Sequence, residues 1–288
     1  SIFTQLPFLC ITVHPAFGRF VTIHKLQRMR ILFFILLLCL GATPGFSQTT
    51  NDSIMFSRIA AQVLSGSRAY ENLRFLCKQV GPRLSGSPQA AKAVTETFRM
   101  MQELGADTVY LQPCMVPRWV RGEQEKAVMN SASGKPRQLR VCALGNSEGT
   151  GVAGLRAQVV EVRSFKQLDS LGTKGIKGKI VFFNYPMNPL HVETFRAYGE
   201  AGAFRSTGPA RAARYGALGV VVRSLASNLD DYPHTGTTNY NDSFPKIPAM
   251  AVSTNDAEWM SKELLAKPAL SLYMRSTCRM LPEVESYN

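Results

Sequence analysis

The sequence predicts an α/β protein made of two parts. Segments with apolar residues at helical spacing alternate along the chain with short segments that have the character of strands. Two of these strand segments, residues 179–183 and 219–222, are almost continuously apolar, as expected for parallel strands covered on both faces. With 288 residues, 45% of them hydrophobic, the chain is long enough for two ordinary domains with packed cores.

The first folded segment is predicted to be helical. Between residues 52 and 80, apolar side chains recur at spacings of three and four, which indicates helix faces that need a core. A turn-rich stretch, residues 81–88, follows. It ends with Ser87 as a helix cap and Pro88 at the first helical position. The helix that begins there is predicted to end at Gly105, because glycine readily adopts the left-handed closing conformation.

Beyond this helix the periodicity becomes that of strands. Residues 108–112 are predicted as a strand, and residues 127–130 and 138–144 as a hairpin joined by a Ser-Gly-Lys-Pro turn. Residues 145–154 are rich in glycine and small polar residues, so we place a domain boundary there.

A compact α/β unit is predicted from residue 155 to about residue 265. Short strands and helices alternate in this region, without an internal repeat. The segments are 157–162, 180–184, 209–215, 218–222, 248–252 and 256–265.

Residues 29–47 have the features of a secretory signal peptide. The apolar run 31–42 is roughly a dozen residues long, well below the ~20 needed to cross a bilayer as a helix. Basic residues precede it, and small residues follow at the two positions that a signal peptidase reads. Met29 opens this unit as an initiator would, so residues 1–28 are interpreted as an upstream extension. We therefore expect an exported protein, periplasmic or secreted, with no stable membrane span; a short membrane anchor is the alternative.

Composition argues against two classes of function. The net charge of +13 comes from basic residues scattered among acids, which favours a solvated surface over a nucleic-acid interface. The cysteines beyond the signal peptide form no CxxC pair and have no histidine at ligand spacing, which argues against a cysteine-based zinc site. Disulfides and free thiols both stay open for them. They are Cys77, Cys114, Cys142 and Cys278.

No residue pattern by itself identifies an active site. Residues 149–154 match G-x-G-x-x-G, but a strand is predicted to follow instead of a helix, so we interpret them as a linker. The G-x-S-x-G motif of serine hydrolases does not occur. After residue 47 the only histidines are His191 and His234, and neither belongs to a recognised metal-binding pair. His191 is interpreted as a surface or helix-start residue. His234 lies in a predicted loop, where contact with a ligand is the alternative to a surface role.

Two sets of motifs together resemble one known family. Residues 81–88, with the helix and strand that follow, resemble the opening of the co-catalytic zinc exopeptidases of the aminopeptidase and glutamate carboxypeptidase group. Further motifs resemble the protease-associated (PA) domain that is inserted in that group. These are residues 178–181, 205–217, 246–250 and 256–258, and residues 233–236 add a further match to a member of the group. They occur in the family's order, and the likeness spans roughly residues 52–288.

The resemblance implies a particular domain organisation. It predicts an α/β fold in which a zinc-exopeptidase domain of the phosphorylase/hydrolase-like type is interrupted by an inserted α/β PA domain. The N-terminal part of the peptidase domain would be residues 52–145, and the PA domain residues 150–266. Residues 267–288 would then be a return strand into a truncated peptidase domain.

The resemblance also implies a function. The family holds two zinc ions through His, Asp and Glu, uses a Glu as general base, and hydrolyses peptide bonds of short peptides as aminopeptidases, carboxypeptidases or dipeptidases. Its first ligand motif follows the segment corresponding to residues 281–288. We therefore expect this chain to be a fragment with no metal or catalytic residue, no bound zinc and no activity alone.

The PA domain of the family lies beside the catalytic cleft and shapes substrate access or dimerisation. Arg205, His234 and Tyr240 are the residues expected to face this cleft, and a homodimer is an expected assembly. No nucleic-acid partner is expected. The alternative function is a non-enzymatic module in which the PA domain binds a protein partner.

Overall fold

The computed structural model describes residues 50–288, and internal contacts divide the chain after Ala69 into two units, which we describe separately. The predicted signal peptide and upstream extension, residues 1–47, lie outside the described residues. In the first unit, helix α2 (Thr50–Gly66) confirms the helical periodicity. Its apolar side chains are solvent-exposed, for example Ile59 at 52% and Val63 at 57%. None of the helices within residues 50–288 has the length and apolar character needed to cross a membrane.

The second unit opens with three helical segments, of which the last was predicted closely. They are α3 (Ala69–Phe75), the π-helical turn η1 (Leu76–Val80) and α4 (Pro88–Glu103). Ser87 caps α4, since its hydroxyl accepts a hydrogen bond from the Ala90 amide at 3.1 Å. Gly105 has a φ of 81°, the left-handed conformation expected just after a helix.

Strands β1 (Pro113–Val120) and β10 (Arg279–Tyr287) form an antiparallel two-stranded ribbon. The predicted strand at residues 108–112 was wrong, because the ladder begins only at Pro113, which lies opposite Tyr287. Of residues 108–112, Gln112 alone exchanges backbone hydrogen bonds, with Asn288, among the described part of the chain. Periodicity indicated an extended segment correctly, but a strand also needs a partner.

The remaining eight strands form one sheet in the order β3-β2-β9-β5-β6-β7-β8-β4. Strands β5, β6, β7 and β8 run parallel to one another, and all other pairs of the sheet are antiparallel. The strands are β2 (Lys126–Asn130), β3 (Pro136–Leu139), β4 (Val141–Ala143), β5 (Leu155–Val162), β6 (Ile180–Phe183), β7 (Gly219–Arg223), β8 (Ala249–Val252) and β9 (Ser271–Arg275).

The predicted hairpin is present, but its second strand is divided. Ala127 pairs with Leu139 as expected, whereas β4 leaves β3 and pairs with β8 at the other end of the sheet order. Only Arg140 separates β3 from β4, so the two ends of the order are brought together and the sheet curls on itself. The Arg140 amide donates to Asp256 Oδ2 at 2.6 Å, which satisfies the backbone where the chain changes partners.

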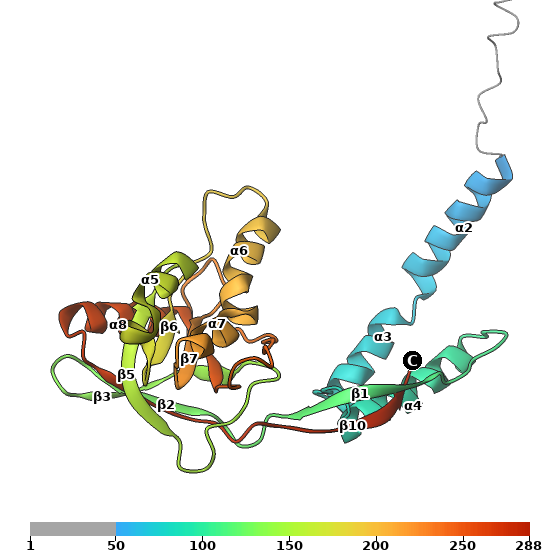
Figure 1. Cartoon of the computed structure of the whole chain (residues 1–288). Helices are drawn as coiled ribbons and strands as arrows, with labels where there is room; N and C mark the ends of the chain where they lie inside the picture. Colours follow the sequence, from blue (N-terminus) through green and yellow to red (C-terminus); the bar gives the residue numbers. More distant parts are fainter. Residues whose placement is uncertain (1–49) are drawn as a thin grey trace, which may run out of the picture. The chain divides into compact units, whose positions relative to one another are not determined.

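Four helices pack around the parallel strands: α5 (Phe165–Ile176), α6 (Thr194–Ser206), α7 (Gly208–Arg214) and α8 (Thr254–Ala266) (Figure 1). Successive strand residues serve different cores. Phe182 belongs to a buried cluster with Met260 and Leu264 of α8, whereas Phe183 belongs to a cluster with Leu168 of α5. This confirms that β6 is covered on both faces, as its continuous apolar run predicted. The G-x-G-x-x-G stretch leads directly into β5, as its interpretation as a linker requires.

Candidate functional site

A loop formed by residues 232–240 runs beside the segment that follows β4. The Gly145 amide donates to the Gly236 carbonyl at 2.8 Å, and the Thr238 amide donates to the Gly145 carbonyl at 2.9 Å. The Thr235 hydroxyl adds a bond to the Ala143 carbonyl at 2.7 Å. These bonds fix a loop that has no helical or strand periodicity of its own. We call it the His234 loop.

Arg205 lies against this loop. A Cβ placed on Gly236 would be 2.5 Å from Arg205 Nε, closer than real carbon contacts come, so glycine makes room for the guanidinium. Arg205 also donates to the Tyr198 hydroxyl at 2.8 Å, and its Cζ lies 5.3 Å from the Tyr198 ring centre. Its Nε is buried and has no hydrogen-bond partner among residues 50–288. The fold therefore brings Arg205 and the His234 loop together, although 27 residues lie between Arg205 and Pro233 in the chain.

His234 is fixed through its backbone. Its amide donates to Ser224 Oγ at 2.7 Å, and the same hydroxyl donates to the Val252 carbonyl. The imidazole is 46% exposed, and its Nε2 lies 3.5 Å from Asp230 Oδ2. The Tyr232 amide, Asn228 and His234 all act to hold the pKa of Asp230 below its usual value, with the Tyr232 amide acting most strongly. A negative carboxylate therefore accompanies an imidazole that solvent can reach.

Tyr240 ends the loop, and its phenol is directed into the protein. The hydroxyl accepts a hydrogen bond from the Glu148 amide at 3.1 Å and donates to the Ile247 carbonyl. Burial raises the pKa of Tyr240, so the phenol stays neutral near pH 7. In this structure Tyr240 anchors the loop. Whether it, Arg205 and His234 face a substrate cleft stays a prediction.

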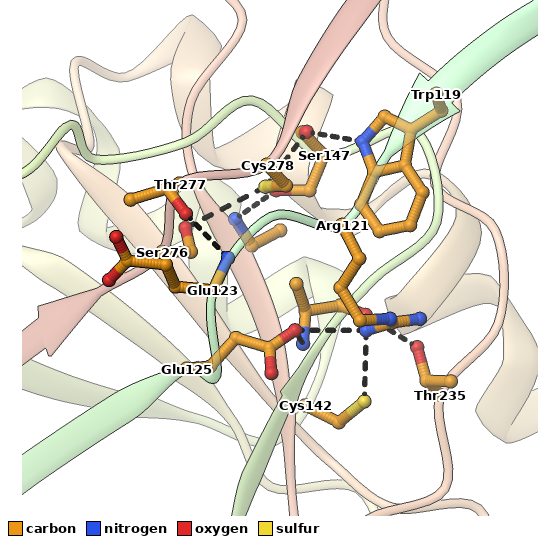
Figure 2. Close-up of polar contacts among 12 residues, drawn as sticks. Trp119, Arg121, Glu123, Glu125, Cys142, Ser147, Thr235, Ser276, Thr277 and Cys278 are labelled. Carbon is orange, nitrogen blue, oxygen red and sulfur yellow. Dashed lines mark hydrogen bonds and ion pairs between the residues drawn. The ribbon is translucent and has the colours of Figure 1, made fainter.

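A group of polar residues lies where the ribbon enters the eight-stranded sheet (Figure 2). Arg121 follows β1, and its Nη1 contacts Glu125 Oε1 at 2.9 Å, Cys142 Sγ at 3.0 Å and the Ala143 carbonyl at 3.1 Å. The Glu125 carboxylate, only 6% exposed, also accepts from the Ala143 amide at 2.9 Å. Because Ala143 also accepts from Thr235, this Arg121 cluster is connected to the His234 loop.

The returning chain is held at the same place. Two side chains donate to the Ser147 carbonyl: Trp119 Nε1 at 2.9 Å and Cys278 Sγ at 3.2 Å. Burial is the main cause that raises the pKa of both Cys142 and Cys278, which keeps the thiols protonated and unreactive at neutral pH. The cluster can therefore fix the two segments that join the ribbon to the sheet, one after β1 and one before β10. Its protonated thiols do not suit nucleophilic catalysis. Sequence reasoning did not identify it, because no local motif joins Trp119, Cys142 and Cys278.

The described residues do not fit a zinc site. Within residues 50–288, no three His, Cys, Asp or Glu side chains gather where they could hold a metal ion. His191 Nε2 lies 2.8 Å from Glu200 Oε1 and His234 pairs with Asp230, so each imidazole is matched with one carboxylate. Zinc sites need three or four protein ligands, and we derive no catalytic step through zinc from these residues.

Comparison with known proteins gives similar proteins among carboxypeptidases and M28 peptidases, although no family model matches the chain. Human carboxypeptidase Q is 35% identical over 224 residues, which are 77% of this chain and 44% of the human protein. A solved peptidase M28 precursor from Shewanella amazonensis SB2B is 32% identical with a TM-score of 0.74, covering 81% of this chain and 51% of its own. A zinc aminopeptidase from Bacillus subtilis is 19% identical with a TM-score of 0.50, covering 76% and 45%, and shows a likeness of fold alone.

These findings confirm the resemblance that the motifs predicted, and the curated relatives are named carboxypeptidase Q. The mixed α/β fold is similar to that of M28 peptidase structures. The chain spans about half the length of the relatives it matches. The chain is similar to carboxypeptidase Q and to an M28 peptidase, and it aligns with one part of each.

Proposed function

We propose that this chain forms part of an exported, zinc-dependent exopeptidase that hydrolyses peptide bonds of short peptides. The observation that carries the proposal is the identity of 35% with human carboxypeptidase Q over 77% of the chain. The similarity to a solved M28 peptidase at a TM-score of 0.74 supports it independently of sequence motifs. The zinc ligands and the catalytic base of the enzyme are, in this proposal, outside the described residues, which offer no metal-binding group.

The proposed organisation places the start of the peptidase domain in residues 52–145, an inserted PA domain in residues 150–266 and the return to the peptidase domain in residues 267–288. All four parallel strands and helices α5 to α8 lie between residues 155 and 266, which supports an inserted α/β unit. Strands β2, β3, β4 and β9 share its sheet. We therefore propose that the inserted unit is larger than residues 150–266 and extends over residues 121–278, between the two strands of the ribbon, which leaves residues 52–120 and 279–288 to the peptidase domain.

Arg205, His234 and Tyr240 are proposed to border the substrate cleft of the complete enzyme. Arg205 contributes a guanidinium and His234 a half-exposed imidazole, both groups that bind peptide carboxylates or carbonyls. Tyr240 contributes by fixing the loop through the Glu148 amide and the Ile247 carbonyl. The Arg121 cluster would then set the position of this loop relative to the ribbon.

The test compares the 288-residue chain with the product of the complete reading frame. We expect the chain alone to carry no stoichiometric zinc by elemental analysis and to show no chelator-sensitive hydrolysis of dipeptides. We expect the complete product to hydrolyse them, to lose activity with a chelator and to regain it with added zinc. Hydrolysis by the chain alone with this zinc dependence would contradict the placement of the ligands. Absence of peptide hydrolysis by the complete product would contradict the proposed peptidase activity and favour the non-enzymatic alternative, in which the PA domain binds a protein partner.

A further inference from the structure

The last part of β5 has a strand neighbour on one side only, which leaves its other edge open in a region that the proposed function does not use. Strand β9 pairs with β5 along residues 155–158, and its last contact is the bond from the Val159 amide to the Leu270 carbonyl at 2.9 Å. Beyond this point β5 has only β6 as a strand neighbour. The Val162 carbonyl accepts from Asn184 on the β6 side. Because successive residues bond to opposite edges, the backbone N–H and C=O of Glu161 point to the open edge.

This open edge forms the floor of a groove of about 540 Å³. Leu264, Leu265 and Pro268, from the end of α8 and the turn after it, line one side. Gln167 of α5 and Lys179, just before β6, line the other side. Leu265 is 87% exposed, so an apolar surface is available to a ligand. The groove thus has an apolar wall, a polar wall and backbone hydrogen-bonding groups between them.

The charge of the groove is positive. Glu161 is the only carboxylate that lines it, and this carboxylate is already satisfied. Glu161 Oε1 accepts from Arg163 Nε at 2.8 Å and Asn184 Nδ2 at 2.9 Å, and both carboxylate oxygens contact Ser261 Oγ. In the described part of the molecule, Lys179 makes hydrogen bonds through its backbone, with Ile176 and Leu218, and its ammonium group has neither a hydrogen bond nor an ion pair. Lys179 is therefore left to bind an acidic group from outside.

We propose that this groove binds an extended acidic peptide segment of a partner protein, by addition next to β5. One ligand residue exchanges backbone hydrogen bonds with Glu161, as in strand addition to a sheet edge. Neighbouring ligand side chains point to opposite walls, because the side chains of a strand alternate between its faces. An apolar side chain lies on Leu264, Leu265 and Pro268, and an adjacent Asp or Glu pairs with Lys179. The inference goes beyond the proposed peptidase function and does not depend on it.

The test uses the full chain and a capped, fluorescently labelled six-residue peptide in which glutamate alternates with leucine. Fluorescence anisotropy measures binding, with a peptide that alternates lysine with leucine as the reference ligand. We expect the acidic peptide to bind and Lys179→Glu to weaken it by about tenfold. Lys174→Glu makes the same charge change on α5, outside the groove, and is expected to change the affinity less than about twofold. Leu265→Asp, at an exposed position that folding tolerates, is expected to weaken binding without changing the unfolding midpoint.

Several outcomes would overturn the proposal. Equal binding of the acidic and basic peptides, or equal effects of Lys179→Glu and Lys174→Glu, would mean that the groove does not recognise acidic segments. If free glutamate displaced the labelled peptide as strongly as the unlabelled peptide does, the groove would be a site for small carboxylates instead. Concentration-dependent dimerisation that Leu265→Asp abolishes, with no peptide binding, would make a second copy of this chain the occupant. N-methylation of the central peptide amides that leaves the affinity unchanged would exclude strand addition at Glu161.

Discussion

Replacing Arg121 by methionine tests whether the Arg121 cluster holds the ribbon to the sheet. Methionine keeps the apolar part of the side chain but removes the donor that contacts Glu125, Cys142 and the Ala143 carbonyl. The Glu125 carboxylate, 6% exposed, would keep only the Ala143 amide as a partner. Breaking a buried ion pair by removing one partner costs about 3–5 kcal/mol. Because Arg121 is 32% exposed and its pairing is partly screened by water, we expect a loss of about 2–3 kcal/mol in the free energy of unfolding.

A double-mutant cycle separates the ion pair from general damage. Glu125→Gln keeps an acceptor for the Ala143 amide but removes the charge, so the double variant Arg121→Met/Glu125→Gln contains no unpaired buried carboxylate. We expect the double variant to lose about 1 kcal/mol less than the sum of the two single variants. Urea unfolding followed by tryptophan fluorescence is a suitable assay, since Trp119 is 7% exposed and lies at this junction. Arg74→Met, which breaks the exposed pair with Glu71, is the matched control and should leave the unfolding midpoint unchanged.

The reasoning would be refuted in two ways. A loss below about 0.5 kcal/mol for Arg121→Met would place the pair among surface interactions that contribute little. Strict additivity of the two substitutions would mean that Arg121 and Glu125 do not depend on each other in the folded chain.

Three further predictions concern other parts of the molecule. A thiol reagent at pH 7 should label the exposed Cys77 quickly and the buried Cys278 slowly. Labelling of Cys278 should begin only at higher pH, because burial raises the pKa of its thiol. Mass spectrometry of the labelled peptides measures both rates, and equal rates would contradict this. Gly236→Ala should destabilise the chain by about 1 kcal/mol in urea unfolding, because its Cβ would meet the Arg205 guanidinium, which is the end of a flexible side chain and can move. Adding Arg205→Ala should recover part of this loss, and no recovery would place the strain elsewhere. Ser87→Ala should lower the free energy of unfolding by about 1 kcal/mol, because α4 loses its cap, whereas Ser87→Asp keeps a capping oxygen and should leave this free energy unchanged. A similar loss in both variants would argue against capping.

Local features of the fold could be read from the sequence because they depend on neighbouring residues. Ser87, Pro88 and Gly105 set the ends of α4 through capping and backbone conformation, which act within a few residues. The apolar runs at β6 and β7 identified strands covered on both faces. The order of the family motifs along the chain identified the relatives, although no chemistry could be assigned to those motifs.

The sites depended on contacts between distant parts of the chain, which the sequence alone did not contain. The division of the predicted 138–144 strand at Arg140 follows from the curling of the sheet, which brings β4 to β8. The ribbon could not be located from periodicity, because β1 is completed by β10, more than a hundred residues later. Only packing placed Arg205 on Gly236 and left the edge of β5 open beside Lys179. Local propensity decides which segments become helices and strands, whereas the neighbours of each segment are decided by burial and by the pairing of backbone groups across the whole chain.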